Sequence, residues 1–189
     1  MPSISDVLDN AALHKTLLGL RLPAALGLVA VLLLYVDPHW FWPGLIVSAL
    51  GLPLELWTSG AIRARKALPV DGPYMFVRHP AHIARFLLIL GLVSMTGMPW
   101  LLLIYVPLYG LYIGYKAGRE EAELEDKFGT QYLRYSKRVP RFVPTLRPYE
   151  EGRPWYFNMK SFRRRYGEIV LVVFPVLYVA CYVAAFHFR

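Results

Sequence analysis

Residues 71–80 combine a turn signal with ionisable side chains, directly before an apolar run. A Gly-Pro pair indicates the turn, and Pro80 suits the first turn of a helix, where its missing N–H costs nothing. His79 is then expected at or near the N-cap of that helix. A helix N-terminus offers free N–H groups and partial positive charge, which bind a carboxylate or phosphate. The stretch predicts either an anion site that includes Arg78 or a plain loop-to-helix junction facing lipid head groups.

A second group of ionisable residues begins at Glu120 and Glu121, about 40 residues further along the chain. Acids at positions 123, 125 and 126 predict that the preceding apolar helix continues out of the membrane. Four apolar or aromatic residues follow at helical spacing and predict one inward face: Leu124, Phe128, Tyr132 and Tyr135. The two glutamates precede this face by three and four residues, so they share it. The segment predicts either a site with two carboxylates or a solvated helix on the bilayer.

Three further polar side chains lie within apolar runs: Glu55, His82 and Arg85. An ionisable group inside a membrane span is a functional candidate by default. His82 and Arg85 are three residues apart and share a helix face, and the guanidinium fork of Arg85 can hold two oxygens of an anionic head group. We predict that these three residues bind the substrate. The alternatives for Arg85 are snorkelling to the interface or pairing with Glu55.

The composition of the 189-residue chain points away from a soluble protein. It is 56% hydrophobic and 18% charged, whereas soluble domains average about a quarter charged residues. Cys181 is the single cysteine, so a disulfide framework and a Cys-rich zinc site are excluded, and we predict no metal site. The formal net charge is +8. In an apolar chain, basic residues of this kind set topology and contact anionic lipid, so no nucleic-acid partner is expected.

Five apolar segments are long enough to cross a membrane, which takes about 20 residues. They are residues 17–36, 40–57, 81–98, 99–115 and 169–188. The short turn between the third and fourth predicts an antiparallel hairpin. We therefore predict an all-α, polytopic membrane protein with about five transmembrane helices in a single domain. Its parts are an interfacial segment (1–16), two N-terminal spans (17–59), a motif-bearing core (60–145), and a basic segment with the last span (146–189).

The basic residues predict the orientation of this protein in the membrane. Of 21 Lys and Arg residues, 13 lie in residues 116–165 and four in residues 60–80, whereas loops 37–39 and 97–99 have none. The positive-inside rule places the N-terminus and both motif segments in the cytoplasm, with the cofactor-binding segment at that face. We expect a multi-pass protein of the bacterial inner membrane. Small residues at four-residue spacing also predict a helix-packing stripe on the fourth span: Gly110, Gly114 and Gly118.

Taken together, the motifs resemble the isoprenylcysteine carboxyl methyltransferases and related phospholipid methyltransferases. The resemblance covers roughly residues 60–145. Its motifs are Gly-Pro-Tyr at 72–74, Arg-His-Pro at 78–80, Glu-Glu at 120–121, Tyr-x-x-Tyr at 132–135 and Arg-Phe-x-Pro at 141–144. It implies an integral-membrane enzyme that moves a methyl group from S-adenosylmethionine to a lipophilic acceptor. The acceptor would enter laterally from the lipid bilayer.

The resemblance also implies roles for particular residues. The implied cofactor-binding set is Tyr74, Arg78, His79, Pro80, Glu120 and Glu121, of which Arg78, Glu120 and Glu121 are also implied as catalytic. Carboxylates suit the positive groups or ribose hydroxyls of the donor, while an arginine and a helix N-terminus suit its carboxylate. The family often has tyrosine and glycine where this chain has His82 and Ala84. This departure leaves open whether the acceptor is an isoprenylcysteine-like carboxylate or a lipid head group.

Two other classes of function remain open on the sequence alone. Membrane sterol reductases share a similar C-terminal core and use NADPH, so a reductase is one alternative. A non-catalytic membrane scaffold is the other, although a scaffold has no need to hold the Arg-His-Pro and Glu-Glu charges.

Overall fold

The computed structural model describes residues 23, 26–27, 29–62, 67–164 and 167–187. The regular elements in these ranges are the 3₁₀ helix η1 (Gly72–Met75) and the helices α3 (Pro38–Gly60), α4 (Pro80–Ser94), α5 (Pro99–Phe128), α6 (Thr130–Arg138), α7 (Met159–Arg164) and α8 (Gly167–His187). Residues 29–35 are helical as well. The predicted all-α class is confirmed for this part of the chain. The predicted interfacial segment 1–16 and most of the first predicted span lie outside it.

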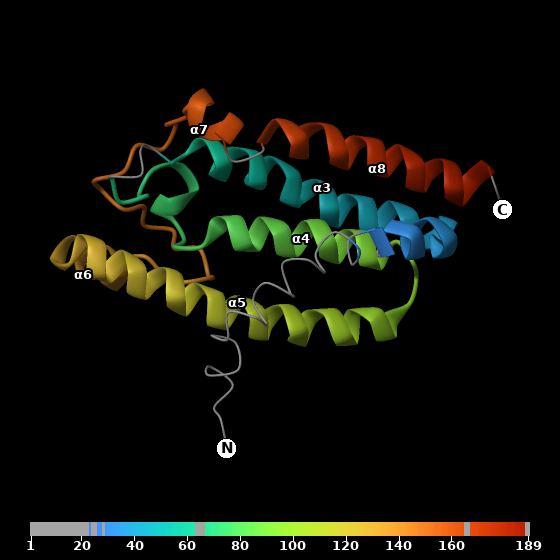
Figure 1. The fold of residues 1–189 in the computed structure, drawn as a ribbon, viewed down its shortest axis with the longest axis horizontal. Helices are drawn as coiled ribbons and strands as arrows, with labels where there is room; N and C mark the ends of the chain where they lie inside the picture. The colour runs from blue at the N-terminus through green and yellow to red at the C-terminus, as the bar shows by residue number, and fades with distance from the viewer. Residues whose placement is uncertain (1–22, 24–25, 28, 63–66, 165–166, 188–189) are drawn as a thin grey trace, which may run out of the picture.

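The long helices form one layer in the order α8, α3, α4, α5 (Figure 1). Helices α3 and α4 run antiparallel at its centre, with α8 beside α3 and α5 beside α4. The turn after α4 passes through Gly97 at a φ of 66°, a conformation that glycine adopts without steric cost. Helix α5 then begins at Pro99. The predicted antiparallel hairpin of the third and fourth apolar segments is therefore confirmed.

Glycines bring the backbones of α3 and α4 into direct contact. A Cβ atom added at Gly91 would lie 2.3 Å from the backbone nitrogen of Ser48 and 2.5 Å from the carbonyl oxygen of Gly44. One added at Gly51 would lie 2.6 Å from the carbonyl oxygen of Ala84. The Ser48 hydroxyl also donates a hydrogen bond of 2.9 Å across the pair to the Leu88 carbonyl. Close backbone approach at small residues is a principal way in which helices associate in lipid.

The predicted glycine stripe on α5 makes no close helix contact within the described part of the chain. Among the described residues, a Cβ atom added at Gly110, Gly114 or Gly118 would meet nothing within 4 Å. The packing role expected of that stripe therefore stays a prediction. Helix α5 instead contacts α4 through tyrosines, because the Tyr109 hydroxyl donates to the His82 carbonyl at 2.9 Å.

In the described part of the chain, two helices, α5 and α8, are long and apolar enough to cross a membrane. Helix α4 is apolar but has 15 residues, about 22 Å at 1.5 Å per residue, less than a hydrocarbon core of about 30 Å. It ends at Ser94, so the third predicted span, 81–98, is helical over a shorter length than expected. Large apolar side chains on α5 and α8, such as Leu103 and Val176, are exposed. The number of five spans stays a prediction.

Apolar side chains form two separate clusters at opposite ends of the helix layer. The first lies at the hairpin end and consists of Leu32, Val36, Phe41, Leu92, Met95, Cys181 and Ala185. The second lies under the motif loops and consists of Leu68, Val70, Met75, Tyr132, Tyr135, Val139 and Tyr149. The free thiol of Cys181 is buried in the first cluster. The motif segments therefore have a core of their own.

The helical face predicted over residues 124–135 is interrupted. Helix α5 ends at Phe128 and α6 begins at Thr130, with Gly129 between them at a φ of 50°. The prediction of one continuous helix is wrong, because spacing alone does not reveal a glycine break. Leu124 and Phe128 nevertheless pack against the second apolar cluster, which contains the two tyrosines of that face.

We expect Gly91→Ala to destabilise the chain, because the added methyl group meets backbone atoms that cannot move aside without separating α3 from α4. Overpacking of this kind costs about 1–3 kcal/mol. Thermal unfolding of the purified protein in detergent measures the effect. Gly114→Ala is the matched control, since it adds the same methyl group on an apolar helix where no described atom is near. An equal midpoint for the two variants would contradict the packing role of Gly91.

Candidate functional site

The Arg-His-Pro motif lies at the start of α4, as the sequence predicts. His79 is the N-cap residue and Pro80 the first helical residue. The backbone N–H groups of Arg78 and His79 donate to the carbonyls of Pro140 and Arg141, at 2.9 and 3.2 Å. The segment that follows α6 is thus held against the motif by main-chain hydrogen bonds.

The same return segment fixes the Gly-Pro-Tyr turn. The N–H of Gly72 donates to the carbonyl of Arg153 at 3.0 Å, and the N–H of Arg153 donates to the Asp71 carboxylate at 2.8 Å. From α6, the Tyr135 hydroxyl donates to the Tyr74 carbonyl at 2.7 Å. Burial raises the pKa of Tyr135 above its ordinary value, so its hydroxyl stays a donor at neutral pH. The loop before α4 is therefore held from two sides.

Glu121 is the centre of the site. Its carboxylate lies 2.9 Å from Arg78 Nη1 and 3.0 Å from His79 Nε2. It also accepts from Arg141, whose Nε is 3.0 and 2.9 Å from the two oxygens and whose Nη2 contacts Oε2. The side chain of Glu121 is only 11% exposed. The hydrogen bonds to Glu121 raise the pKa of Arg141 above its ordinary value.

Arg78 has a second partner on α6, because its Nη1 donates to the Tyr132 hydroxyl at 3.2 Å. Burial raises the pKa of Tyr132, while the hydrogen bond from Arg78 acts in the opposite direction. The Nε atom of Arg78 is buried with no hydrogen-bond partner among the described residues. One donor of this guanidinium is therefore left for another group.

Glu120, the neighbouring carboxylate, lies between two imidazoles. Its Oε2 is 3.1 Å from His82 Nε2 and 3.5 Å from His79 Nδ1. The side chain is 41% exposed, whereas both imidazoles are buried. Adjacent residues of α5 thus have different environments: Glu121 is enclosed by its partners and Glu120 faces open space.

That open space is a cavity of about 310 Å³, which we call the motif cavity. Cationic, acidic and aromatic side chains line much of it. The lining residues are Ile62, Pro69, Tyr74, Arg78, His79, Ala81, His82, Arg85, Glu120, Glu123, Leu124 and Lys127. It therefore brings together the Tyr74 loop, the start of α4 and the last part of α5.

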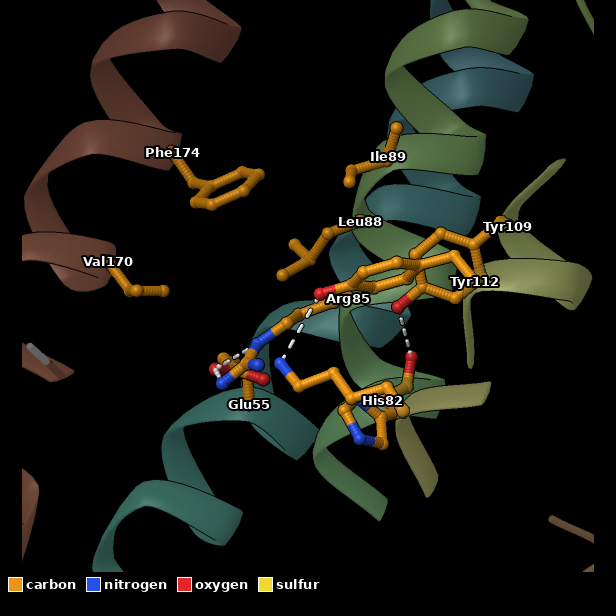
Figure 2. A pocket seen from close by; sticks show the side chains of 10 residues that line it. Glu55, His82, Arg85, Leu88, Ile89, Tyr109, Tyr112, Val170 and Phe174 are labelled. Atoms are coloured by element: carbon orange, nitrogen blue, oxygen red, sulfur yellow. Dashed lines mark hydrogen bonds and ion pairs between the residues drawn. The ribbon is translucent and has the colours of Figure 1, made fainter. Parts of the chain in front are cut away.

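A second cavity of about 380 Å³ lies deeper along α4, and we call it the inner cavity. Figure 2 shows Val170 and Phe174 of α8 on one side and Tyr109 and Tyr112 of α5 on the other, facing across α4. The complete lining is Glu55, His82, Arg85, Leu88, Ile89, Tyr109, Tyr112, Lys116, Val170 and Phe174. His82 and Arg85 line both cavities, so they form a shared wall.

Arg85 pairs with Glu55 across the α3–α4 contact, which confirms one of the alternatives open on the sequence. Its Nε and Nη2 donate to Glu55 Oε1 at 3.1 and 3.0 Å (Figure 2). The other oxygen, Oε2, is buried and has no hydrogen-bond partner among the described residues. The pair therefore has an unused acceptor at the inner cavity.

The predicted site residues thus fall into one connected region. The motif cavity is lined by Tyr74, Arg78, His79 and Glu120. Pro80 is the first residue of α4, and Glu121 contacts Arg78 and His79. The predicted substrate residues, Glu55, His82 and Arg85, line the inner cavity. Their roles in binding and catalysis remain predictions.

Sequence reasoning gave no role to four residues that complete these sites: Arg141, Tyr132, Tyr109 and Lys116. Arg141 and Tyr132 lie in recognised motifs, so the sequence did contain a signal for their place in the site. Tyr109 and Lys116 carried none, because their position at the inner cavity depends on how α5 packs against α4.

Residues 44–131 of the chain match the phospholipid methyltransferase family. The chain is 32% identical over 79 residues to Protein-S-isoprenylcysteine O-methyltransferase of Schizosaccharomyces pombe, covering 42% of this chain and 34% of the relative. No solved structure gives a significant match. The resemblance recognised from the motifs is therefore confirmed for residues 44–131, which are similar to phospholipid and isoprenylcysteine methyltransferases.

Two bacterial relatives match a longer part of the chain. The cobalt-zinc-cadmium resistance protein CzcN of Cupriavidus metallidurans is 28% identical over 138 residues, 72% of this chain and 63% of the relative. The nickel-cobalt-cadmium resistance protein NccN of Alcaligenes xylosoxydans xylosoxydans is 28% identical over 141 residues, 71% and 66% of the two chains. The chain thus spans less than two thirds of the CzcN relative. The family match and the two apolar helices together indicate a membrane protein that is similar to methyltransferases.

We expect Glu121→Gln to destabilise the protein far more than Glu120→Gln. Removing the Glu121 charge leaves Arg78 and Arg141 without their anion, and breaking a buried ion pair costs about 3–5 kcal/mol. The half-exposed Glu120 charge should cost about 1 kcal/mol or less. Thermal unfolding of both variants in the same detergent makes the comparison. Equal midpoints would show that Glu121 is not the anchor of the site.

Proposed function

We propose that this chain transfers a methyl group from S-adenosylmethionine to a lipophilic acceptor. The observation that carries the proposal is the pair of cavities with a shared wall. The motif cavity is rich in charged groups, whereas the inner cavity has apolar walls from α4 and α8 and a few polar groups at one end. A polar donor and a lipid-like acceptor need two such compartments that meet at His82 and Arg85.

The side chains of the motif cavity suit the charges of this donor, which has a carboxylate, an ammonium and a sulfonium. Arg78 has a buried Nε–H without a partner, which can donate to a carboxylate. Glu120 is half-exposed in the cavity and offers a carboxylate to a positive group or a ribose hydroxyl. Glu121 is enclosed by Arg78, His79 and Arg141, so its role is to fix the first two in position.

The inner cavity suits an acceptor with an apolar chain and a polar head. Leu88, Ile89 and Phe174 offer apolar surface, while Arg85 and Lys116 are its cations. A cation at this point favours an anionic head group such as a carboxylate or phosphate. The Schizosaccharomyces pombe relative is named for a prenylated cysteine carboxylate, which fits this description. A lipid head group fits it as well.

The donor, when bound, supplies an electrophilic methyl group that passes to the acceptor by in-line displacement. The residues of this chain mainly hold the two reactants close together and exclude water, which can lower a barrier by several kcal/mol. A carboxylate acceptor needs no base. An amine or thiol acceptor must lose a proton, which His82 on the shared wall can accept with Glu120 as its hydrogen-bond partner.

We further propose that the chain is a multi-pass protein of the bacterial inner membrane with both cavities toward the cytoplasm. The many basic residues of the motif segments support this orientation. The exposed apolar surfaces of α5 and α8 support lateral entry of the acceptor from the lipid, because large exposed apolar patches mark interaction or membrane surfaces.

Methyl-labelled S-adenosylmethionine, incubated with the purified protein and membrane lipids, tests the proposal. We expect a labelled lipophilic product, identified by mass spectrometry. His79→Ala should weaken donor binding about tenfold or more, while His39→Ala, at the far end of α3, should not change it. Absence of donor binding together with binding of NADPH would favour the reductase alternative instead. Binding of neither would favour the scaffold.

A prediction for Arg85 separates acceptor binding from helix packing. Arg85→Leu alone would leave Glu55 buried without its partner, so the informative comparison is Glu55→Gln against the double variant Glu55→Gln/Arg85→Leu. We expect the double variant to raise the acceptor KM about tenfold over Glu55→Gln, with donor affinity unchanged. Equal acceptor KM values for the two would assign Arg85 to packing alone.

A further inference from the structure

A compact group of metal-ligand types lies at the edge of the motif cavity. His79 and His82 are three residues apart at the start of α4, with ring centroids 5.6 Å apart, and Glu120 reaches them from α5. Glu120 Oε2 lies 3.1 Å from His82 Nε2 and 3.5 Å from His79 Nδ1. One ligand atom from each residue lies within 4.8 Å of the other two. We propose that His79, His82 and Glu120 bind a divalent transition-metal ion, with Zn²⁺ as the first candidate.

The distances fit a tetrahedral ion. Zinc binds imidazole nitrogen and carboxylate oxygen at about 2.0–2.2 Å, so two ligands of a tetrahedral site are separated by about 3.3–3.6 Å. The two measured separations from Glu120 are 3.1 and 3.5 Å. The ligand atoms of the two imidazoles lie within 4.8 Å of each other, so side-chain rotation is needed to bring all three atoms around one ion. Three protein ligands leave a fourth position for water.

Glu121 sets the tautomer that His79 needs for this role. An ionised carboxylate only accepts hydrogen bonds, and Glu121 Oε1 lies 3.0 Å from His79 Nε2. With the ion bound, the ring proton of His79 would face Glu121 from Nε2, and the lone pair of Nδ1 would face the ion beside Glu120. A carboxylate behind a ligating histidine is the usual second layer of a metal site. Arg78 and Arg141 hold that carboxylate in place.

The cluster is also accessible and carries a suitable charge. All three residues line the motif cavity, and Glu120 is half-exposed there, so an ion can reach it from the cavity mouth. Two neutral imidazoles and one carboxylate offer the mixed nitrogen and oxygen set that zinc accepts. The three residues come from two elements, so the ion would also join the start of α4 to α5.

Metal binding has a consequence that rests on the proposed function. His79 and Glu120 are among the residues that we propose for holding the methyl donor. Their lone pairs cannot serve the ion and the donor at the same time. The ion should therefore compete with S-adenosylmethionine, so that a rise in free zinc lowers the affinity of the chain for its donor.

Isothermal titration of the untagged, chelator-treated protein in detergent with zinc chloride tests the site. We expect one ion per chain, and absorption bands of four-coordinate cobalt when Co²⁺ replaces Zn²⁺. His82→Gln and Glu120→Gln should each weaken zinc binding about tenfold or more. His39→Gln is the matched control, since His39 is an exposed histidine beside a carboxylate, Asp37, on another part of the chain.

Several outcomes would overturn the proposal. They are the absence of saturable zinc binding, a loss below about threefold in Glu120→Gln, and an equal loss in His39→Gln. Glu120 is half-exposed, so its variant remains informative if His82→Gln does not fold. Competition is measured separately, as donor affinity with and without saturating zinc. Zinc binding with unchanged donor affinity would overturn the competition alone. Zinc binding by a protein that transfers no methyl group even in the metal-free state would reject the proposed function but not the metal site.

Discussion

The buried carboxylate of Glu121 is the constraint on which the motif cavity depends. A charge in a poorly solvated place is stable only with close partners, and here Arg78, His79 and Arg141 provide them. These partners come from the loop before α4, the start of α4 and the segment after α6. One anion on α5 thus binds two separate parts of the chain, the Arg78–His79 junction and the segment after α6. Glu121 is enclosed by these partners, whereas its neighbour Glu120 faces the motif cavity. The two adjacent acids differ because successive residues of a helix point in different directions.

Local rules predicted the local features of the site. The N-cap at His79 and the first turn at Pro80 follow from the residue types themselves. The shared face of His82 and Arg85 follows from their spacing. Pairing of Arg85 with Glu55 was one of two alternatives, since the sequence shows two opposite charges in apolar runs but not the contact between them. Only the packing of α3 against α4 shows that Arg85 pairs with Glu55 rather than reaching the interface.

The features that the sequence did not reveal depend on partners distant in the chain. The glycines of α3 and α4 meet a neighbouring backbone, whereas Gly110 and Gly114, which have the more regular spacing, meet none among the described residues. Arg141 reaches Glu121 only because the chain turns back after α6. The break at Gly129 was equally hidden, because the aromatic spacing continues across it. The residues that share a helix face can be predicted from one segment, but the part of the chain that this face contacts cannot.

The glycine contact between α3 and α4 also limits how such a protein can be redesigned. Gly91 and Gly51 leave no room for a new side chain between these two helices, and the Glu55–Arg85 pair bridges them. The inner cavity, in contrast, takes part of its wall from Val170 and Phe174 on α8 and Tyr112 on α5. Libraries aimed at a new acceptor should therefore vary the outer helices and keep the central pair fixed. The part of the inner cavity that α5 and α8 supply can therefore be varied without disturbing the close contact between α3 and α4.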